Sequence, residues 1–235
     1  MISTKNSLEN VEVVGLGQAC VDYLGRIPAY PREDGKVELM DLHTQCGGPA
    51  STALVTLSRL EIRTSFLGSI SDDPFGIEIR KGLEKEKVDT TFLKVTPGFT
   101  SQFAFIAITK EHGARTIFWN RGSVTHLTSD DVVLRPFANA RIYHTDGLML
   151  EASIEAAKQA KDMGMTIVMD AGTLRKGYRA LVSLVDVLIM SQGFGEALVG
   201  VGEPPEKALK TPPSTPPTTA TTRWSRATTI AAPTR

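Results

Sequence analysis

The 235-residue sequence predicts an α/β protein: a parallel sheet with helices on both faces, plus a small β lid. Two observations predict this class. Short, nearly continuous apolar strands alternate with segments of helical periodicity, as in parallel sheets that are buried on both faces. One hairpin without an intervening helix interrupts the alternation, and we assign it to the lid.

The first elements follow from local patterns. The apolar, valine-rich run Val11 to Gly17 predicts a buried strand. The segment Leu24 to Leu42 is polar and contains Pro28, Pro31 and Gly35, which favours irregular strands at a sheet edge. We expect this region, 24–42, to form the lid together with residues 98–122.

A helix and a strand come next. Pro49 to Leu60 has apolar residues at helical spacing, which predicts one buried helix face. The expected members of that face are Ala50, Ala53, Leu54, Leu57 and Leu60. Arg63 to Ile70 predicts a strand, and Pro74 marks a second helix start, because proline at the first helical position loses no hydrogen bond.

The hairpin consists of two β-rich runs, Gln102 to Thr109 and Ala114 to Trp119, joined by Lys110-Glu111-His112-Gly113. We expect it to lie outside the main sheet, as an antiparallel flap.

Strand and helix patterns then alternate again. Their expected bounds are a helix start at Thr128-Ser129-Asp130-Asp131, a strand Arg141 to Thr145, a helix Ser153 to Met163 closed by Gly164, a strand Thr166 to Asp170, a short helix Gly177 to Leu184 and a strand Val185 to Met190.

The composition changes near Glu203. Seven of the 13 prolines and nine threonines lie between Pro204 and Arg235, and no acidic residue follows Glu206. We therefore expect an α/β domain over residues 11–202 and a Pro/Thr-rich tail over 203–235. Such a tail is typical of disorder, or of a frameshifted or truncated gene product.

Bulk composition excludes several classes. Lys+Arg and Asp+Glu are both 26, so no basic excess indicates nucleic acid or an anionic membrane as a partner. No apolar run reaches transmembrane length, and the first residues lack a signal-peptide core. The two cysteines are too few for a disulfide framework, so we expect a cytoplasmic protein.

Several catalytic and metal motifs are absent. Gly15-Leu16-Gly17 lacks the third glycine of a dinucleotide fingerprint, whose place is taken by Cys20. The histidines at 43, 112, 126 and 144 have no metal-type spacing, and we expect them at the surface or only lightly buried.

Gly47-Gly48 directly precedes the Pro49 helix. Two glycines there let main-chain amides approach a ligand, and a helix N-terminus favours an electronegative group. A tight strand-to-helix turn explains the same residues equally well.

The longer context resembles the N-terminal signature of the ribokinase (PfkB) family of carbohydrate kinases. The matching residues are Cys46-Gly47-Gly48-Pro49-Ala50-Ser51-Thr52-Ala53 and Gly68-Ser69-Ile70-Ser71-Asp72-Asp73-Pro74-Phe75-Gly76. The resemblance covers about Glu12 to Gly202, and it implies a ribokinase-like fold whose C-terminal part is missing from this chain.

The resemblance also implies roles. Asp22 is expected to accept hydrogen bonds from sugar hydroxyls, Gly47 and Gly48 to offer main-chain groups, and Thr52 to replace an Asn of many members. Asp146 is a weaker expectation for the same site. ATP and Mg²⁺ are the implied cofactors, a small-molecule sugar the implied substrate, and a homodimer through the β lid the implied assembly.

Three departures from the family pattern bear on activity. Ser191 stands where many members have an Asn of the metal and phosphate network, and Phe194 stands where many have a Glu. The family's Gly-Ala-Gly-Asp, which supplies the catalytic base and the phosphate cradle, occurs nowhere in the chain. The sequence therefore predicts an ATP-dependent sugar kinase by family whose present chain is inactive. A non-catalytic sugar-binding or dimerising protein, and a remnant that folds poorly, remain as alternatives.

Overall fold

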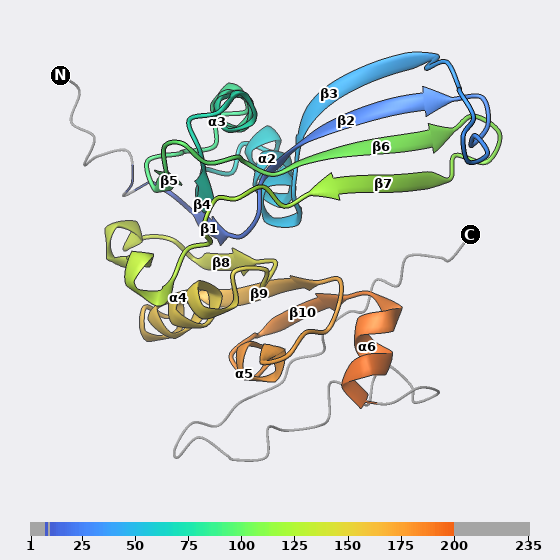
Figure 1. Ribbon diagram of the computed structural model, residues 1–235. Helices are drawn as coiled ribbons and strands as arrows, with labels where there is room; N and C mark the ends of the chain where they lie inside the picture. Colours follow the sequence, from blue (N-terminus) through green and yellow to red (C-terminus); the bar gives the residue numbers. More distant parts are fainter. Residues whose placement is uncertain (1–7, 9, 200–235) are drawn as a thin grey trace. The chain divides into compact units, whose positions relative to one another are not determined.

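The computed structural model describes residue 8 and residues 10–199 (Figure 1). The chain divides into two compact units. Unit 1 combines the described parts of Met1–Gly17 and Leu127–Arg235, and unit 2 is Gln18–His126. The predicted tail, 203–235, lies outside the described residues.

Unit 1 contains four parallel strands in the order β10-β9-β8-β1. Their bounds are β1 Val13–Leu16, β8 Ile142–Thr145, β9 Thr166–Ala171 and β10 Val187–Met190. Gly15 pairs with His144, and His144 with Val168, so β8 lies between β1 and β9, and most residues of these three strands are buried. The predicted strands are thus present and parallel.

One face of these strands is covered by α4 (Leu150–Asp162), which packs on β8 and β9. The contact is partly polar: the Tyr143 hydroxyl donates to the main-chain oxygen of Ser153 at 3.3 Å, and the hydroxyls of Thr145 and Ser153 lie 3.0 Å apart. Gly164, at φ 75°, closes this helix as predicted. The remaining helices are α5 (Tyr178–Val182) and α6 (Gln192–Val199).

The helix start predicted at Thr128 is wrong in kind. Only a 3₁₀ turn forms, η1 (Ser129–Asp131), followed by a second, η2 (Arg135–Phe137). Thr128 and Asp131 form a capping box, but Val132 returns to an extended conformation and ends the turn. A capping signal fixes where a helix begins and does not supply the residues that continue it.

Unit 2 contains the parallel pair β4 (Thr64–Ile70) and β5 (Leu93–Val95), with helices α2 (Pro49–Arg59) and α3 (Pro74–Lys85). Ala50 and Leu54 are buried on α2 as predicted, but Leu60 is 67% exposed. The placement of Leu60 on the buried face is wrong, because α2 ends at Arg59 and Leu60 is its C-cap.

The other sheet of unit 2, called the lid sheet below, has the strand order β3-β2-β6-β7 (Figure 1). Its strands are β2 (Cys20–Ile27), β3 (Asp41–Gly47), β6 (Phe103–Thr109) and β7 (Arg115–Asn120). The hairpin β6–β7 is confirmed and lies outside the parallel strands, but β2 and β6 run parallel, so the sheet is mixed.

The region 24–42 differs from the predicted irregular edge strands. β2 pairs with both β3 and β6 and is therefore an inner strand, and residues 28–40 form no strand. Pro28 and Pro31 interrupt the ladder because proline has no N–H to donate. The strands themselves extend outside the predicted range, back to Cys20 and on to Gly47.

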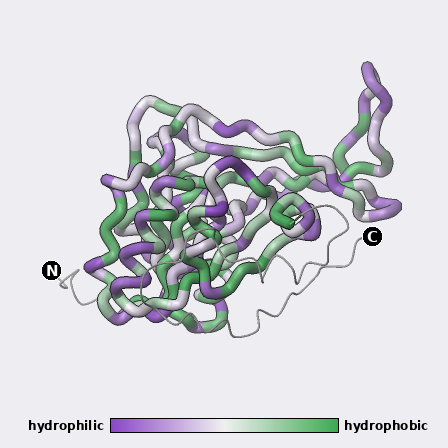
Figure 2. The backbone as a smooth tube through the Cα atoms, turned by 90° about the horizontal axis from the view of Figure 1, so that it is seen from below, coloured by the Kyte–Doolittle hydropathy of each residue, from purple (hydrophilic) through white to green (hydrophobic). Residues whose placement is uncertain are grey.

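The α/β class with a parallel sheet, helices and a separate lid sheet is thus confirmed. No helix within the described residues combines the length and apolar character needed to cross a membrane, and Figure 2 shows hydrophobic and hydrophilic residues interspersed along the chain.

Candidate functional site

Asp22 and Gly47 lie side by side on neighbouring strands of the lid sheet. Cys20 pairs with Gly47 and Asp22 with Gln45, so Cys20, Asp22 and Gly47 share one face of β2 and β3. A Cβ built on Gly47 would collide with both carboxylate oxygens of Asp22. The glycine therefore makes room for the carboxylate that the sequence assigns to sugar binding.

Gly48 is fixed by a different constraint. It is the N-cap of α2 with φ 105°, and a Cβ there would collide with the main chain of Gln18 and lie 2.9 Å from the Cα of Ala19. Both the backbone conformation and the close approach of the connection between β1 and β2 require glycine. The structure thus contains the tight strand-to-helix turn that the sequence offers as one explanation, and the approach of a ligand to these main-chain groups stays a prediction.

The first turn of α2 follows this pair. The Ser51 hydroxyl donates to the main-chain oxygens of Gly47 at 2.6 Å and Gly48 at 3.1 Å, which fixes the glycines to the helix. Thr52 donates its N–H to Gly48 at 3.0 Å, while its side chain is exposed. No side chain caps this N-terminus, so its partial positive charge remains available to an electronegative group.

The Asp22 carboxylate, which is half-buried, has a second neighbour. The thiol of Cys20 donates to Asp22 Oδ1 at 3.1 Å, and Cys20 is only 5% exposed. Burial raises the pKa of the Cys20 thiol far above its usual range, and the nearby Asp22 charge raises it further. The thiol is therefore protonated at neutral pH and acts as a hydrogen-bond donor.

The opposite face of β2 and β6 packs on α3. Phe75, from the first turn of α3, stacks on Phe103 with ring centroids 4.6 Å apart and meets the edge of Tyr23 at 6.5 Å. These aromatic side chains anchor the lid strands to the helix, which leaves Asp22 on the other face. From the sequence, Phe75 is known only as a member of the family signature.

The two acids of the Asp72-Asp73-Pro74 motif are used inside the fold. Asp73 caps α3 by accepting from the N–H of Gly76 at 2.9 Å, and it also accepts from the N–H and hydroxyl of Ser101 at 3.0 and 2.6 Å. Asp72 accepts from the N–H of Gly98 at 2.9 Å, which lowers the pKa of its carboxyl. Both carboxylates fix the segment that leads into β6.

Asp146 belongs to unit 1, whereas the other four predicted site residues, Asp22, Gly47, Gly48 and Thr52, all belong to unit 2. It follows β8, is 3% exposed, and accepts from the N–H of Leu148 at 2.9 Å. The next residue, Gly147, has φ 68°, and a Cβ there would press on Met169 and Leu181. Asp146 thus stands in a tight turn after a strand, a position that suits ligand contacts in α/β sheets.

The expectation of surface histidines is wrong for His144. This side chain is 8% exposed, because β8 runs between β1 and β9, and its Nε2 has no hydrogen-bond partner. Burial lowers the pKa of His144, and the charge of Asp170 opposes that shift. Across the described part of the chain no three His, Cys, Asp or Glu residues are grouped closely enough to hold a metal ion.

Ser191 and Phe194 do not fit a metal and phosphate network. The Ser191 hydroxyl donates to the main-chain oxygen of Gly172 at 2.6 Å and accepts from the N–H of Phe194 at 3.1 Å, so it caps α6. Phe194 is fully buried, with its ring centroid 6.3 Å from that of Tyr178. At these two positions the chain has a helix-capping hydroxyl and a core side chain, in place of the amide and the carboxylate that the family resemblance implies.

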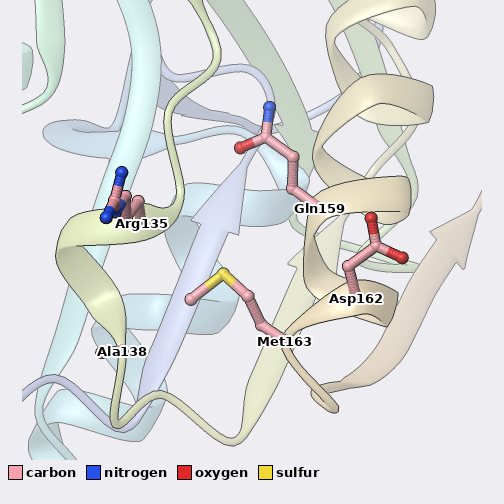
Figure 3. A pocket seen from close by; sticks show the side chains of 5 residues that line it. All are labelled: Arg135, Ala138, Gln159, Asp162 and Met163. Atoms are coloured by element: carbon pink, nitrogen blue, oxygen red, sulfur yellow. The ribbon is translucent and has the colours of Figure 1, made fainter.

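A shallow pocket of about 400 Å³ lies elsewhere in unit 1 (Figure 3). Its lining residues are Arg135, Ala138, Gln159, Asp162 and Met163. Gln159 is already engaged: its amide oxygen accepts from Leu134 N–H at 2.9 Å, and its nitrogen donates to Val132 O at 3.1 Å. The Gln159 side chain therefore holds the segment before η2 on α4. None of the predicted site residues lines this pocket.

The fold and the carboxylate–glycine pair define an α/β protein with a lid sheet that presents a carboxylate beside a helix N-terminus. The sequence profile of the pfkB family of carbohydrate kinases matches residues 10–214. This chain belongs to that family.

Individual relatives are more distant. The chain is 23% identical over 180 residues to an ATP-dependent ribose-1-phosphate kinase of Halopiger xanaduensis, covering 76% of this chain and 60% of the relative. It is 24% identical over 192 residues to a ribokinase of Haemophilus influenzae, covering 79% and 61%. The chain thus spans about three fifths of the length of these curated relatives.

Solved structures show the same fold. A ribokinase from Giardia lamblia superposes with a TM-score of 0.71 at 17% identity, covering 85% of this chain and 64% of that one. An Arabidopsis thaliana ribokinase, solved with ribose and ATP, gives 0.66 at 18% identity, covering 85% and 67%. At these identities the likeness concerns the fold alone.

Proposed function

We propose that this chain binds a small sugar through unit 2. Asp22 accepts hydrogen bonds from sugar hydroxyls, and Gly47 and Gly48 present main-chain groups to the same ligand. The observation that carries the proposal is the Asp22 carboxylate held against Gly47, beside the uncapped N-terminus of α2. A carboxylate offers several acceptor sites, and hydrogen bonds to a charged group are stronger than those to a neutral one.

Two residues have narrower roles in the proposal. Thr52 projects from the first turn of α2 and offers one hydroxyl, which both donates and accepts. Asp146, after β8 in unit 1, is a second acceptor for a sugar hydroxyl. Family membership and the fold support a sugar ligand, and the names of the relatives include ribose kinases and fructokinases.

The activity we propose for the family's full-length kinase is ATP-dependent phosphorylation of a sugar hydroxyl with Mg²⁺, in the cytoplasm. The solved relative with ribose and ATP supports ATP as the phosphoryl donor. For the 235-residue chain itself we propose sugar binding without turnover. Gly-Ala-Gly-Asp does not occur in the sequence, and Ser191 and Phe194 are used for a helix cap and for packing.

A non-catalytic, dimerising protein is the second candidate, and one observation favours it. The outer lid strand β7 is exposed along its whole length, and Ile117, Phe118 and Trp119 are 48%, 50% and 53% exposed. Consecutive exposed apolar residues on an edge strand promote association. A homodimer through the lid sheet covers them.

Calorimetric titration of the 235-residue chain with D-ribose, D-fructose, D-gluconate and adenosine tests sugar binding. We expect one of these ligands to bind without added ATP; absence of binding by all four contradicts the proposal. Light scattering coupled to gel filtration tests the dimer, with Phe118→Ser as the variant and Val133→Ser, at an exposed apolar residue of unit 1, as the control. We expect only Phe118→Ser to produce a monomer.

A further inference from the structure

Cys20 and Asp22 are two residues apart on β2 and therefore share one face of the lid sheet. The Cys20 thiol lies 3.1 Å from Asp22 Oδ1, and the Asp22 carboxylate lies against the Cα of Gly47. The carboxylate thus has a thiol donor on one side and a glycine main chain on the other. Both neighbours limit rotation of the carboxylate about the Cβ–Cγ bond. The torsion angle about this bond is otherwise broadly distributed in Asp.

We propose that Cys20 is a positioning residue for sugar binding: its thiol donates to Asp22 and holds that carboxylate in the orientation that receives the sugar hydroxyls. This inference rests on the sugar-binding role of Asp22 proposed above. A carboxylate that is ordered before the ligand arrives loses less conformational entropy on binding, so fixing its rotamer raises affinity. Cys20 does not itself need to contact the sugar.

The protonation state of the thiol agrees with this role. Burial and the charge of Asp22 both raise the pKa of Cys20, so the proton stays on sulfur and the thiol remains a donor at neutral pH. The hydrogen bond joins a buried side chain to a half-buried one, where competition from water is weak.

Cys46 provides a matched comparison. It pairs with Val21 and therefore lies on the opposite face of the lid sheet, toward α3. Its sulfur contacts the main-chain oxygens of Glu78 at 3.7 Å and Ile79 at 3.6 Å, and a Cβ on Gly82 would collide with it. Cys46 thus packs against a helix, whereas Cys20 bonds a carboxylate.

The test compares Cys20→Ala and Cys20→Ser with the wild-type chain in calorimetric titrations of whichever of D-ribose, D-fructose, D-gluconate and adenosine the wild type binds. Removing the donor in Cys20→Ala should weaken binding about five- to tenfold, the scale of one ordinary hydrogen bond, because a thiol is a weak donor even to a charged acceptor. Cys20→Ser restores a donor and should bind within about twofold of wild type. Cys46→Ala should leave affinity unchanged.

Melting temperatures separate positioning from packing. A serine hydroxyl gives up its hydrogen bonds to water for one bond to Asp22, whereas a methyl group gives up none, so Cys20→Ser should melt no higher than Cys20→Ala. If Cys20 positions Asp22, Cys20→Ser should therefore bind the sugar more tightly than Cys20→Ala without having a higher melting temperature. If Cys20→Ser binds no better than Cys20→Ala, or if affinity simply follows the melting temperature, the positioning role is wrong.

An Asp22→Asn background tests whether Cys20 acts through Asp22. There, Cys20→Ala should change affinity by less than twofold, because the charged acceptor is gone. A further five- to tenfold loss of affinity in that background, which corresponds to ~1 kcal/mol, contradicts the inference. Cys20 would then affect sugar binding independently of the Asp22 carboxylate. Binding by wild type and Cys20→Ala with equal affinity overturns the inference alone. Absence of binding by the wild type overturns the sugar-binding function itself, and the inference with it.

Discussion

The carboxylate of Asp22 occupies the space that a side chain at residue 47 would fill, so Gly47 and Asp22 are mutually dependent. The sequence treats them as independent motifs, a strand-end acid and a glycine pair before a helix. In the structure they are diagonal neighbours on β2 and β3, since Gly47 lies two residues beyond Gln45, the partner of Asp22. A change at either position should therefore alter the other.

Gly47→Ala should lower both stability and sugar affinity, because the new methyl group displaces the Asp22 carboxylate. Insertion of one methyl group into a packed site costs about 1–3 kcal/mol. In an Asp22→Ala background the collision partner is absent, so Gly47→Ala should recover most of the lost melting temperature. Thermal unfolding of the single and double variants measures this coupling.

Gly48→Ala is the control for that pair. Its methyl group meets the main chain of Gln18, and its φ is 105°, so Asp22→Ala cannot relieve it. If the Asp22→Ala background recovers neither glycine variant, the proposed dependence between Gly47 and Asp22 is wrong.

Asp22→Ala should weaken sugar binding about ten- to a hundredfold, which corresponds to ~1.5–3 kcal/mol for hydrogen bonds to a charged group. Calorimetry on the two proteins measures the difference, with melting curves to show that both are folded. Asp130→Ala, at an exposed acid of η1, is the matched control and should bind like wild type. Equal affinities for Asp22→Ala and wild type would remove Asp22 from the site.

Asp73→Ala should destabilise unit 2, because it removes the cap of α3 and two hydrogen bonds to Ser101 together. Loss of a helix cap and of charge-assisted hydrogen bonds costs roughly 2 kcal/mol or more. For a chain of this size that is a fall in melting temperature of about 4–8 °C.

Asp72→Ala provides the comparison, because Asp72 is exposed and accepts a hydrogen bond from the N–H of Gly98 at the surface. We expect it to lower the melting temperature less than Asp73→Ala does. Hydrogen exchange adds a local measurement, because the amide of Ser101 should lose protection only in Asp73→Ala. The opposite order of the two variants contradicts the structural role assigned to Asp73.

His144 makes unit 1 sensitive to acid. Its pKa is lowered in the folded state by burial, so the unfolded chain binds the proton more readily. Stability from this group is fully present above the ordinary histidine pKa of about 6.5, and it is lost as pH falls below that value. The melting temperature should therefore fall between pH 7 and pH 5, beyond the change caused by other groups.

Replacement of this histidine tests the assignment. His144→Gln should show a flatter dependence on pH over the same range, whatever its absolute stability. His43→Gln, which alters an exposed histidine, should keep the wild-type dependence. Identical pH profiles for wild type and His144→Gln would exclude His144 as the group that titrates.

The parallel strands and the hairpin could be predicted because their signals are local. Val13–Leu16 is a continuous apolar run, Thr166–Ala171 contains the apolar residues Ile167, Val168 and Met169 in succession, and Lys110-Glu111-His112-Gly113 separates the two β-rich runs of the hairpin. The pairing of β2 with β6 could not be predicted, because nothing in Cys20–Ile27 indicates which strand lies beside it. The same limit hid the burial of His144, which depends on the strands at both sides of β8.

For the candidate site, sequence reasoning identified Asp22 and the glycine pair but not the contacts that hold them. Cys20 was considered only as the residue that breaks a dinucleotide motif, although its spacing of two from Asp22 places both side chains on one strand face. Asp73 belonged to a recognised motif, yet its partner Ser101 lies 28 residues away, beyond the reach of a local pattern.

The last prediction concerns catalysis by the 235-residue chain. Phosphoryl transfer requires positioning, neutralisation of phosphate charge and a base for the attacking hydroxyl. In the function proposed above, the residues of unit 2 contribute only the positioning of the sugar. Ser191 caps α6 and Phe194 is buried, so the positions that the family resemblance assigns to metal and phosphate binding have neither the amide nor the carboxylate side chain. The sequence after Glu206 contains no carboxylate side chain and no glycine.

Loss of a general base alone lowers a rate by about a hundred- to ten-thousandfold, and loss of oriented donors for the transferring group multiplies that effect. We therefore expect no measurable sugar-dependent ADP release from this chain with D-ribose, D-fructose, D-gluconate or adenosine, in a coupled assay with Mg²⁺ and ATP. If another reading frame of the gene encodes a strand followed by Gly-Ala-Gly-Asp, a chain extended in that frame should release ADP with at least one of them, and Asp22→Ala in that longer chain should weaken this release. Sugar-dependent turnover by the 235-residue chain that is abolished by Asp22→Ala would show that its own residues complete the catalytic site, because contaminating kinases would not respond to that substitution.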